Sequence, residues 1–181
     1  MARLLYSATM SLDGYIAGPD GDMSWLAPYL GPNPIIDNLI NDVGALLVGR
    51  RTFGGDDPYK GTKGEGEAFG GGWSGSQFVV THRPPPSSPP GTVFMNDLAE
   101  AIAASRRAAG EKYVNVLGAS IARQCLQCGE LDEVLVCIAP VLLGDGVRLL
   151  DLTGGTNVRL ERTDVSLAAH ATNVWFRIVR N

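Results

Sequence analysis

The feature that most constrains the fold is a regular alternation of short apolar runs with segments of helical periodicity. The apolar runs are rich in Val, Ile and Leu, and glycine, proline or asparagine separates them from the helical segments. Such alternation is typical of an α/β sheet with mostly parallel strands. We expect strands at 3–10, 45–49, 76–83, 112–118 and 131–144. We expect helices from Pro34 onward, with Asn33 as the N-cap, at 96–110, with Asn96 as the N-cap, and at 119–129.

The end of the chain has a different pattern. Residues 158–181 alternate in the manner of two antiparallel strands, and we expect them to join near 170–173. The chain has 181 residues, of which 45% are hydrophobic, and this is enough to fill one sizeable core. We therefore predict a single α/β domain over 1–181, with a mostly parallel central sheet, flanking helices and a C-terminal antiparallel hairpin.

The charge balance argues against nucleic acid as a partner. Acidic residues outnumber basic ones 19 to 15, the net charge is -4, and the basic residues are scattered. The first 18 residues contain one early arginine and a brief apolar run that polar residues interrupt, which is neither a signal peptide nor a membrane span. We expect no nucleic-acid partner and no membrane partner, while a local basic pocket for a small anion stays open.

The cysteines indicate a reducing compartment, and we expect the cytoplasm. Three cysteines cannot form a closed disulfide framework. Cys125 and Cys128 form a C-x-x-C near a helix end, whereas a redox pair usually opens a helix, so the buried structural interpretation is favoured. We predict no metal site, because there is no second cysteine pair and His82 and His170 are both far along the chain.

Two segments are expected to be loops. Glycine is so frequent over 54–75 that regular structure is not expected there, and the proline-rich stretch 84–91 is a stiff extended connector. Solvent-exposed loop is the default interpretation for both. One alternative is a lid in which Phe69 and Trp73 cover a bound ligand, and another is a contact surface for a partner.

Three strand ends carry residues suited to an anionic ligand. In open α/β sheets, ligands bind beyond the carboxyl ends of the strands, where helix N-termini direct free N–H groups outward. Each signal alone is weak, because arginines at strand ends are commonly solvated and a glycine there can be a simple turn. Together they are typical of a site for a polyanionic nucleotide. The residues are Arg50, Arg51 and Thr52 after the second expected strand, Thr81, His82 and Arg83 at the end of the third, and Gly118, Ala119, Ser120 and Ile121 at the end of the fourth.

A Rossmann dinucleotide site is not indicated. That site requires G-x-G-x-x-G after the first strand, and "SLDGYIAGPDGDMSW" stands there instead. The segment "GTKGEGEAFGGGWSG" likewise lacks the G-K-[ST] ending of a phosphate loop.

Five segments, in this order, resemble the dihydrofolate reductase superfamily, and the nearer match is the branch related to the reductase domain of riboflavin biosynthesis, the RibD C-terminal domain. The resemblance extends over nearly the whole chain, and the order is far more specific than any one segment. The segments are "SLDGYIAGPDGDMSWL", "LLVGRRTF", "VVTHR", "VLGASIARQCLQCGELDEVLV" and "APVLLGDGVRLL".

The resemblance implies NADPH as hydride donor and a ring-containing substrate, reduced at a carbon–nitrogen double bond or a sugar carbonyl. It implies that residues 49–52 lie at the adenosine-side phosphates, 81–83 at the 2'-phosphate, 118–121 beside the diphosphate and nicotinamide, and Ala8 with 16–18 along the nicotinamide. Trp25 resembles the aromatic residue after the mobile loop, on the substrate side. The implied cofactor-binding residues are Ala8, Ile16, Ala17, Gly18, Gly49, Arg50, Arg51, Thr52, Thr81, His82, Arg83, Gly118, Ala119, Ser120 and Ile121.

The chain departs from the pattern of dihydrofolate reductases in two places. Ala119 stands where those enzymes have a second glycine, and the substrate-binding carboxylate is displaced because the loop after Trp25 is longer. The candidates for proton delivery are Asp37, early in the helix that follows this loop, and Asp13. Each has a structural alternative, since Asp37 complements a helix dipole and Asp13 precedes Gly14 in a turn.

Our leading hypothesis is an NADPH-dependent reductase of a pterin-like, riboflavin-precursor-like or carbonyl substrate. The alternative is a nucleotide-binding or sensor protein of the same fold without catalysis. The partners would be a small-molecule substrate and, because of the apolar run "VLVCIAPVLL" near the antiparallel edge, a second copy in a homodimer.

Overall fold

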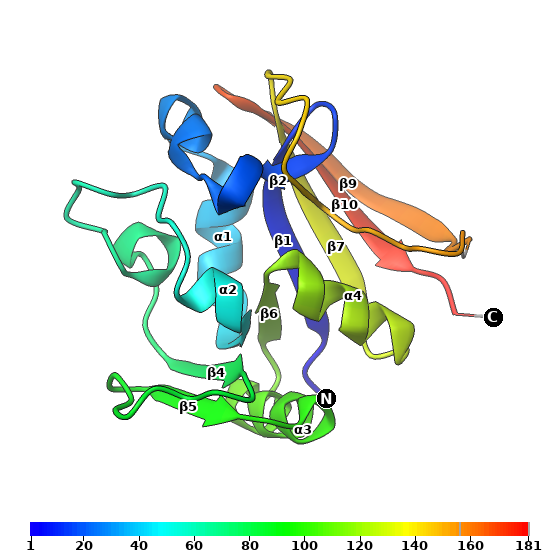
Figure 1. Ribbon diagram of the computed structural model, residues 1–181. Helices are drawn as coiled ribbons and strands as arrows, with labels where there is room; N and C mark the ends of the chain where they lie inside the picture. Colours follow the sequence, from blue (N-terminus) through cyan, green and yellow to red (C-terminus); the bar gives the residue numbers. More distant parts are fainter. Residues whose placement is uncertain (156, 181) are drawn as a thin grey trace.

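The sheet predicted from the alternating pattern is present in the computed structural model, which describes residues 1–155 and 157–180. Eight strands form one sheet in the order β5-β4-β3-β6-β1-β7-β10-β9 (Figure 1). The first six strands of this order run parallel, and β10 is antiparallel to both β7 and β9. The strands are β1 (Leu4–Ser11), β3 (Val43–Gly49), β4 (Ser76–Val80), β5 (Thr92–Met95), β6 (Tyr113–Leu117), β7 (Glu133–Ala139), β9 (Leu160–Ala168) and β10 (Ala171–Ile178).

Helices cover both faces of the central strands. Leu39 of α1 packs in a core with Leu46 and Val48 of β3, while Ile102 of α3 and Ile121 of α4 pack in a second core on the other face. Burial on both sides explains why the central strands are continuously apolar. The helices are α1 (Pro34–Asp42), α2 (Arg50–Phe53), α3 (Leu98–Ala109) and α4 (Ala119–Gln127), with short 3-10 helices η1 (Pro19–Gly21), η2 (Ser24–Tyr29) and η3 (Ala68–Gly71).

A small second sheet closes over the carboxyl end of β1. It pairs β2 (Tyr15–Ala17) antiparallel with β8 (Val147–Arg148). The backbone N–H of Leu149 donates to the carbonyl of Gly14 at 2.9 Å, which ties the two segments together beyond the strands. Residues 139–150 are therefore held against the loop that follows β1.

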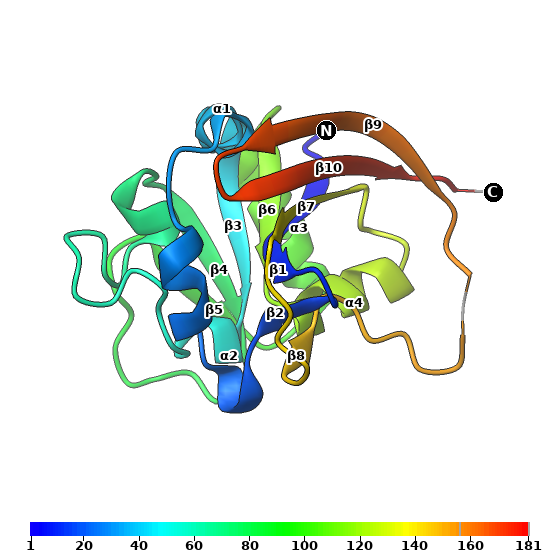
Figure 2. The same ribbon diagram turned by 90° about the horizontal axis from the view of Figure 1, so that it is seen from above.

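The C-terminal hairpin is confirmed, and it runs past the start of α1 (Figure 2). Its turn lies at 169–170, slightly before the expected 170–173. Asn33, expected as the N-cap of α1, holds that position, but its side chain does not cap the helix. The Asn33 amide donates to Asn173 Oδ1 at 2.9 Å, and the Asn173 amide donates to Asn33 Oδ1 at 3.0 Å. This reciprocal pair fastens α1 to the hairpin.

Two element boundaries and one additional strand differ from the sequence expectation. The strand expected over 131–144 ends at Ala139, because Pro140 has no N–H to continue the ladder. The pattern did not indicate β5, whose four residues directly follow the proline-rich connector. The N-cap of α3 is Asp97 rather than Asn96, and its carboxylate accepts from the N–H of Glu100 at 2.8 Å.

The apolar run lies next to the antiparallel hairpin, as expected, but it is not itself an edge strand. β7 pairs with β1 on one side and β10 on the other, so both of its backbone edges are occupied. The edge strand on this side of the sheet is β9, where Val165 is 50% exposed and Leu167 is 77% exposed. In the described part of the chain, no helix has the length and apolar character that crossing a membrane requires.

Candidate functional site

The segments after β3, β4 and β6 meet along one edge of the sheet. These three strands are neighbours in the order β4-β3-β6 and run parallel, so their carboxyl ends lie side by side. We call residues 50–52, 81–83 and 118–121 the carboxyl-end rim. The arrangement brings together the groups that the sequence suggested for an anionic ligand.

Glycines let two segments of this rim approach each other closely. Gly118 has φ +105°, and a Cβ built on it would lie 2.3 Å from Oγ1 of Thr52. A Cβ on Gly49 would lie 3.1 Å from Cγ1 of Ile121. The start of α2 is therefore packed directly against the start of α4, and a side chain at Gly118 would force them apart.

A pocket of about 310 Å³ opens beside the start of α4. Its walls come from α2, from α4 and from the segment that contains β8. Among the described side chains none caps the N-terminus of α4, so the N–H groups of Ala119, Ser120 and Ile121 are free to meet an anion. The lining residues are Arg51, Ala119, Ser120, Arg123, Gly146, Val147, Arg148 and Asp151.

Three arginines of this pocket have no carboxylate partner. Among the described residues, no ion pair includes Arg51, Arg123 or Arg148. The Nε of Arg123 is buried and has no hydrogen-bond partner within residues 1–155 and 157–180. Unpaired guanidinium groups at a helix N-terminus attract anions strongly, so the pocket is suited to a phosphate-containing ligand.

Sequence reasoning did not identify Arg123 and Arg148. Arg123 lies four residues after Ala119 and therefore on the same face of α4, which helical spacing could have indicated once the start of the helix was known. Arg148 reaches the pocket only because β8 pairs with β2, placing it opposite Tyr15 in the ladder. A pairing of two such short strands has no local sequence signal.

The third segment of the rim does not line this pocket. Thr81 is buried; its N–H donates to the carbonyl of Met95 at 2.7 Å, and its Oγ1 accepts from the N–H of Arg83 at 3.1 Å. His82 and Arg83 are exposed at the end of β4. The turn at Thr81 thus places His82 and Arg83 at the end of β4, which is separated from β6 by the strand β3.

The remaining residues of the expected cofactor site are distributed around the pocket. Arg50 is exposed and folds back, with its Nη1 2.3 Å from the position of a Cβ on Gly54. Ala8 lies on β1, and Ile16, Ala17 and Gly18 lie on or directly after β2. A Cβ on Gly146 would lie 2.1 Å from the carbonyl oxygen of Ala17, so the pocket wall touches this segment directly.

Asp13 is held as a carboxylate by its neighbours. It accepts from Ser11 Oγ at 2.6 Å and from the backbone N–H groups of Leu143 and Gly144 at 3.0 and 2.7 Å. The Ser11 hydroxyl and these N–H groups lower the pKa of Asp13 to about 2. Asp13 is therefore ionised at neutral pH and fastens the 139–150 segment to the loop after β1.

Asp37 lies in the first turn of α1 and is exposed. There its negative charge interacts favourably with the positive end of the helix dipole, which is the structural alternative stated for this residue. The described hydrogen bonds include none from or to its carboxylate, which leaves that group free for other contacts.

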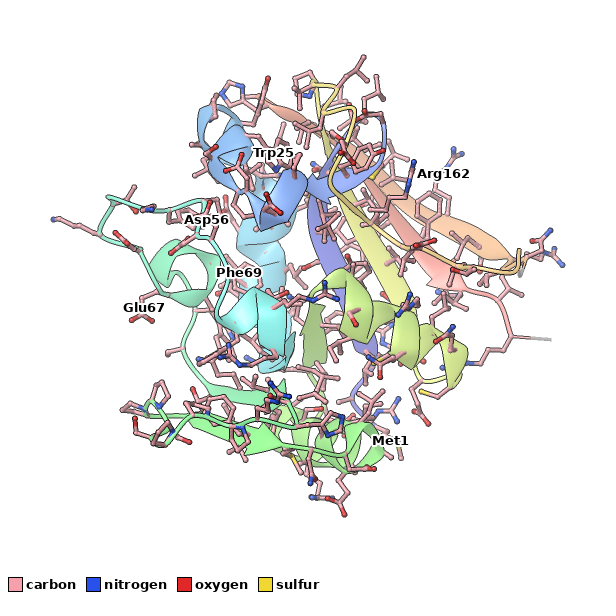
Figure 3. The ribbon with its side chains drawn as sticks, viewed as in Figure 1. Met1, Trp25, Asp56, Glu67, Phe69 and Arg162 are labelled. Carbon is pink, nitrogen blue, oxygen red and sulfur yellow. The ribbon has the colours of Figure 1, made fainter. Side chains whose placement is uncertain are left out.

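Trp25 lies in η2, near β2 and the upper part of α1 in Figure 3. Its ring is partly buried, 6.4 Å from the ring of Tyr29, and its Nε1 is buried without a hydrogen-bond partner. A buried indole N–H usually finds an acceptor, and the described part of the chain supplies none to this one.

The glycine-rich segment is anchored to the protein. Phe69 and Trp73 pack against the core that α1 forms with β3, and Trp73 Nε1 donates to the carbonyl of Val43 at 3.0 Å. Figure 3 shows Phe69 on the α1 and α2 side of the molecule. These contacts explain both aromatic residues as anchors and do not require the lid alternative.

The buried structural interpretation holds for Cys125 and Cys137 but is wrong for Cys128. Cys125 and Cys137 are buried, Cys128 is exposed, and all three are free thiols. Burial raises the pKa of Cys125 and of Cys137 to about 12, so both are thiols at neutral pH. In residues 1–155 and 157–180, no group of three or more His, Cys, Asp or Glu side chains could hold a metal ion.

Several solved structures have a fold similar to that of this chain. A putative riboflavin biosynthesis protein from Shewanella sp. PV-4 has 24% sequence identity and a TM-score of 0.74, covering 99% of this chain and 100% of that one. Dihydrofolate reductase from Enterococcus faecalis, complexed with NADP(H), has 14% identity and a TM-score of 0.61, covering 97% and 96%. These likenesses confirm the dihydrofolate reductase-like fold.

Similarity in sequence identifies the family of the chain. The uncharacterized protein YwjB of Bacillus subtilis is 31% identical over 174 residues, which are 88% of this chain and 89% of that protein. The sequence profile of the RibD C-terminal domain matches residues 2–172. The chain therefore belongs to the RibD C-terminal domain family.

Proposed function

We propose that the protein is an NADPH-dependent reductase that transfers a hydride to a small heterocyclic or carbonyl substrate. The family and fold relate the chain to reductases. The observation that carries the proposal is the pocket at the start of α4, where three arginines without ion pairs face an uncapped helix N-terminus. Pterin-like and riboflavin-precursor-like rings are the substrates we favour.

The residues around the pocket fit a dinucleotide. Residues 49–52 and 118–121 would hold the phosphates of the adenosine half, with Gly118 keeping the two segments in contact. Thr81 fixes the turn from which His82 and Arg83 would bind the 2'-phosphate. Ala8 and residues 16–18 would line the nicotinamide. When bound, NADPH supplies the hydride, and the protein excludes water and orients the acceptor.

The proton for the substrate heteroatom needs a different source from Asp13. With a pKa of about 2, that carboxylate carries no proton to donate at neutral pH. In this proposal Asp13 positions residues 143–146, and the proton comes from a water that Asp37 or Asp13 would hold. Trp25 would lie on the substrate side, with its partly buried ring in η2.

The test is oxidation of NADPH by the purified protein with a panel of pterins, flavin precursors and small carbonyls. Turnover with one class identifies the substrate chemistry. Binding of NADPH without turnover across the panel would favour the non-catalytic sensor, and absence of NADPH binding would overturn both. The cytoplasmic location and the homodimer stay predictions, and the mass of the protein in solution tests the latter.

Arg83 provides a sharper test of the cofactor. The change Arg83→Gln should weaken NADPH roughly tenfold or more and leave NADH almost unchanged, because only NADPH carries the 2'-phosphate. Calorimetric titration of both cofactors measures the two dissociation constants. Arg162→Gln is a matched control, since Arg162 is exposed on β9, far from the rim in Figure 3. Equal losses for both cofactors would show that Arg83 does not recognise the 2'-phosphate.

A further inference from the structure

Arg123 and Arg148 come from distant parts of the chain and line the same pocket as Arg51. Arg123 stands in the second turn of α4, and Arg148 is the last residue of β8. The structure gives neither of them a carboxylate partner, although carboxylates pair with arginines elsewhere in the protein. A cluster of like charges without counter-ions is costly for a folded protein, which suggests that a ligand supplies the negative charge.

The charge of the pocket matches a diphosphate diester. Three guanidinium groups and the single carboxylate of Asp151 leave two positive charges, and the N-terminus of α4 adds a partial positive charge. The bridging diphosphate of a dinucleotide carries two negative charges. Its oxygens can accept from guanidinium groups and from free helix N–H groups at the same time.

The position of the pocket separates it from the expected 2'-phosphate site. The pocket lies at α4, which follows β6, whereas His82 and Arg83 follow β4, and β3 lies between those two strands. One phosphate group cannot contact both places, but the two ends of an adenosine diphosphate moiety can. The segment with Arg148 also touches Ala17, on the side expected for the nicotinamide.

We propose that Arg123 and Arg148, together with Arg51, bind the diphosphate of the dinucleotide, and that Tyr15 positions Arg148. This inference rests on the proposed function for the identity of the ligand. Tyr15 is 8% exposed, its hydroxyl accepts from Arg148 Nη2 at 3.2 Å, and the guanidinium lies 4.9 Å from the centre of its ring. The buried ring therefore restricts the guanidinium of an otherwise mobile surface side chain.

The experiment is calorimetric titration of NADPH, NADH and inorganic pyrophosphate into the wild-type protein, Arg123→Gln, Arg148→Gln and the control Arg162→Gln. Each pocket variant should weaken both dinucleotides by the same factor, about tenfold or more, because both carry the diphosphate. Pyrophosphate should lose affinity in parallel and should compete with NADPH. The control should bind all three ligands like the wild type, and thermal unfolding confirms that each variant is folded.

Other outcomes overturn the inference in distinct ways. Unchanged dissociation constants in both pocket variants would exclude these arginines as ligands. A loss confined to NADPH would assign them to the 2'-phosphate instead. If the wild type binds pyrophosphate but neither dinucleotide, and the variants lose pyrophosphate, then the anion site is retained and the proposed function fails.

Tyr15→Phe tests the positioning role. This variant keeps the ring beneath Arg148 but removes the hydroxyl acceptor, so binding of both dinucleotides should weaken by a smaller factor than in Arg148→Gln. In an Arg148→Gln background the same change should have no further effect. An equal loss in both backgrounds would show that Tyr15 acts independently of Arg148.

Discussion

Arginines at the two ends of the parallel strands are used in opposite ways. At the amino ends, Arg3 pairs with Glu133 at the start of β7, and Arg106 and Arg180 pair with Asp132 just before it. At the carboxyl ends, Arg51, Arg123 and Arg148 share a pocket, and none of them forms an ion pair with another residue that the structure describes. The same side chain thus stabilises the fold at one end and is left available for a ligand at the other.

The carboxylates show the same contrast. Glu133 is only 5% exposed and accepts from Arg3, from Tyr113 Oη at 3.1 Å and from Trp175 Nε1 at 2.7 Å. Asp13, at the other end, is satisfied by a hydroxyl and backbone N–H groups rather than by any arginine. In this protein, the absence of ion pairs among charged side chains is therefore a better indicator of a binding site than the number of charged side chains in one place.

The largest effect should come from removing Glu133, which lies at the amino ends of the strands. Glu133→Ala leaves the Trp175 and Tyr113 donors without their acceptor, and we expect the free energy of unfolding to fall by about 3 kcal/mol. Arg51→Gln should change it by less than about 0.5 kcal/mol, because Arg51 is exposed and unpaired. Urea denaturation measures both. Comparable losses in the two variants would remove the distinction between the two ends.

Gly118→Ala should have an intermediate effect. The residue has φ +105°, and the new Cβ would meet Thr52 Oγ1, so we expect a loss of about 2 kcal/mol together with weaker cofactor binding. Gly129→Ala is the matched control, because Gly129 also has a positive φ, +76°, but open space around it. The excess loss at Gly118 over Gly129 measures the contact between the two segments. No excess would show that α2 and α4 tolerate separation at this point.

The smallest effect concerns pH. The folded-state pKa of Asp13, about 2, lies below the value of roughly 3.9 expected in an unfolded chain. Its contribution to stability is therefore present above about pH 4 and is lost as the pH falls through about 2. Asp13→Asn should be less stable than the wild type near neutral pH and should approach it at the acid end. A difference in thermal midpoint that does not shrink on acidification would contradict the bonds described for Asp13.

The sequence allowed prediction of features that depend on local pattern. Strands such as β3 are continuously apolar because both of their faces are buried. The end of this apolar run at Gly49 was therefore visible in the sequence, and it placed Arg50 and Arg51 at the carboxyl end of the strand. Features that depend on contacts between distant segments had no such signal. Arg148 depends on the pairing of β2 with β8, and the state of Asp13 depends on backbone groups 130 and 131 residues away.

The most direct test of the central claim is a crystal structure of the protein with NADP⁺. We expect the diphosphate at the start of α4, with its oxygens within hydrogen-bond distance of the guanidinium groups of Arg51, Arg123 and Arg148, and the 2'-phosphate beside Arg83. A dinucleotide bound elsewhere, or one that leaves those arginines without contact, would contradict this expectation.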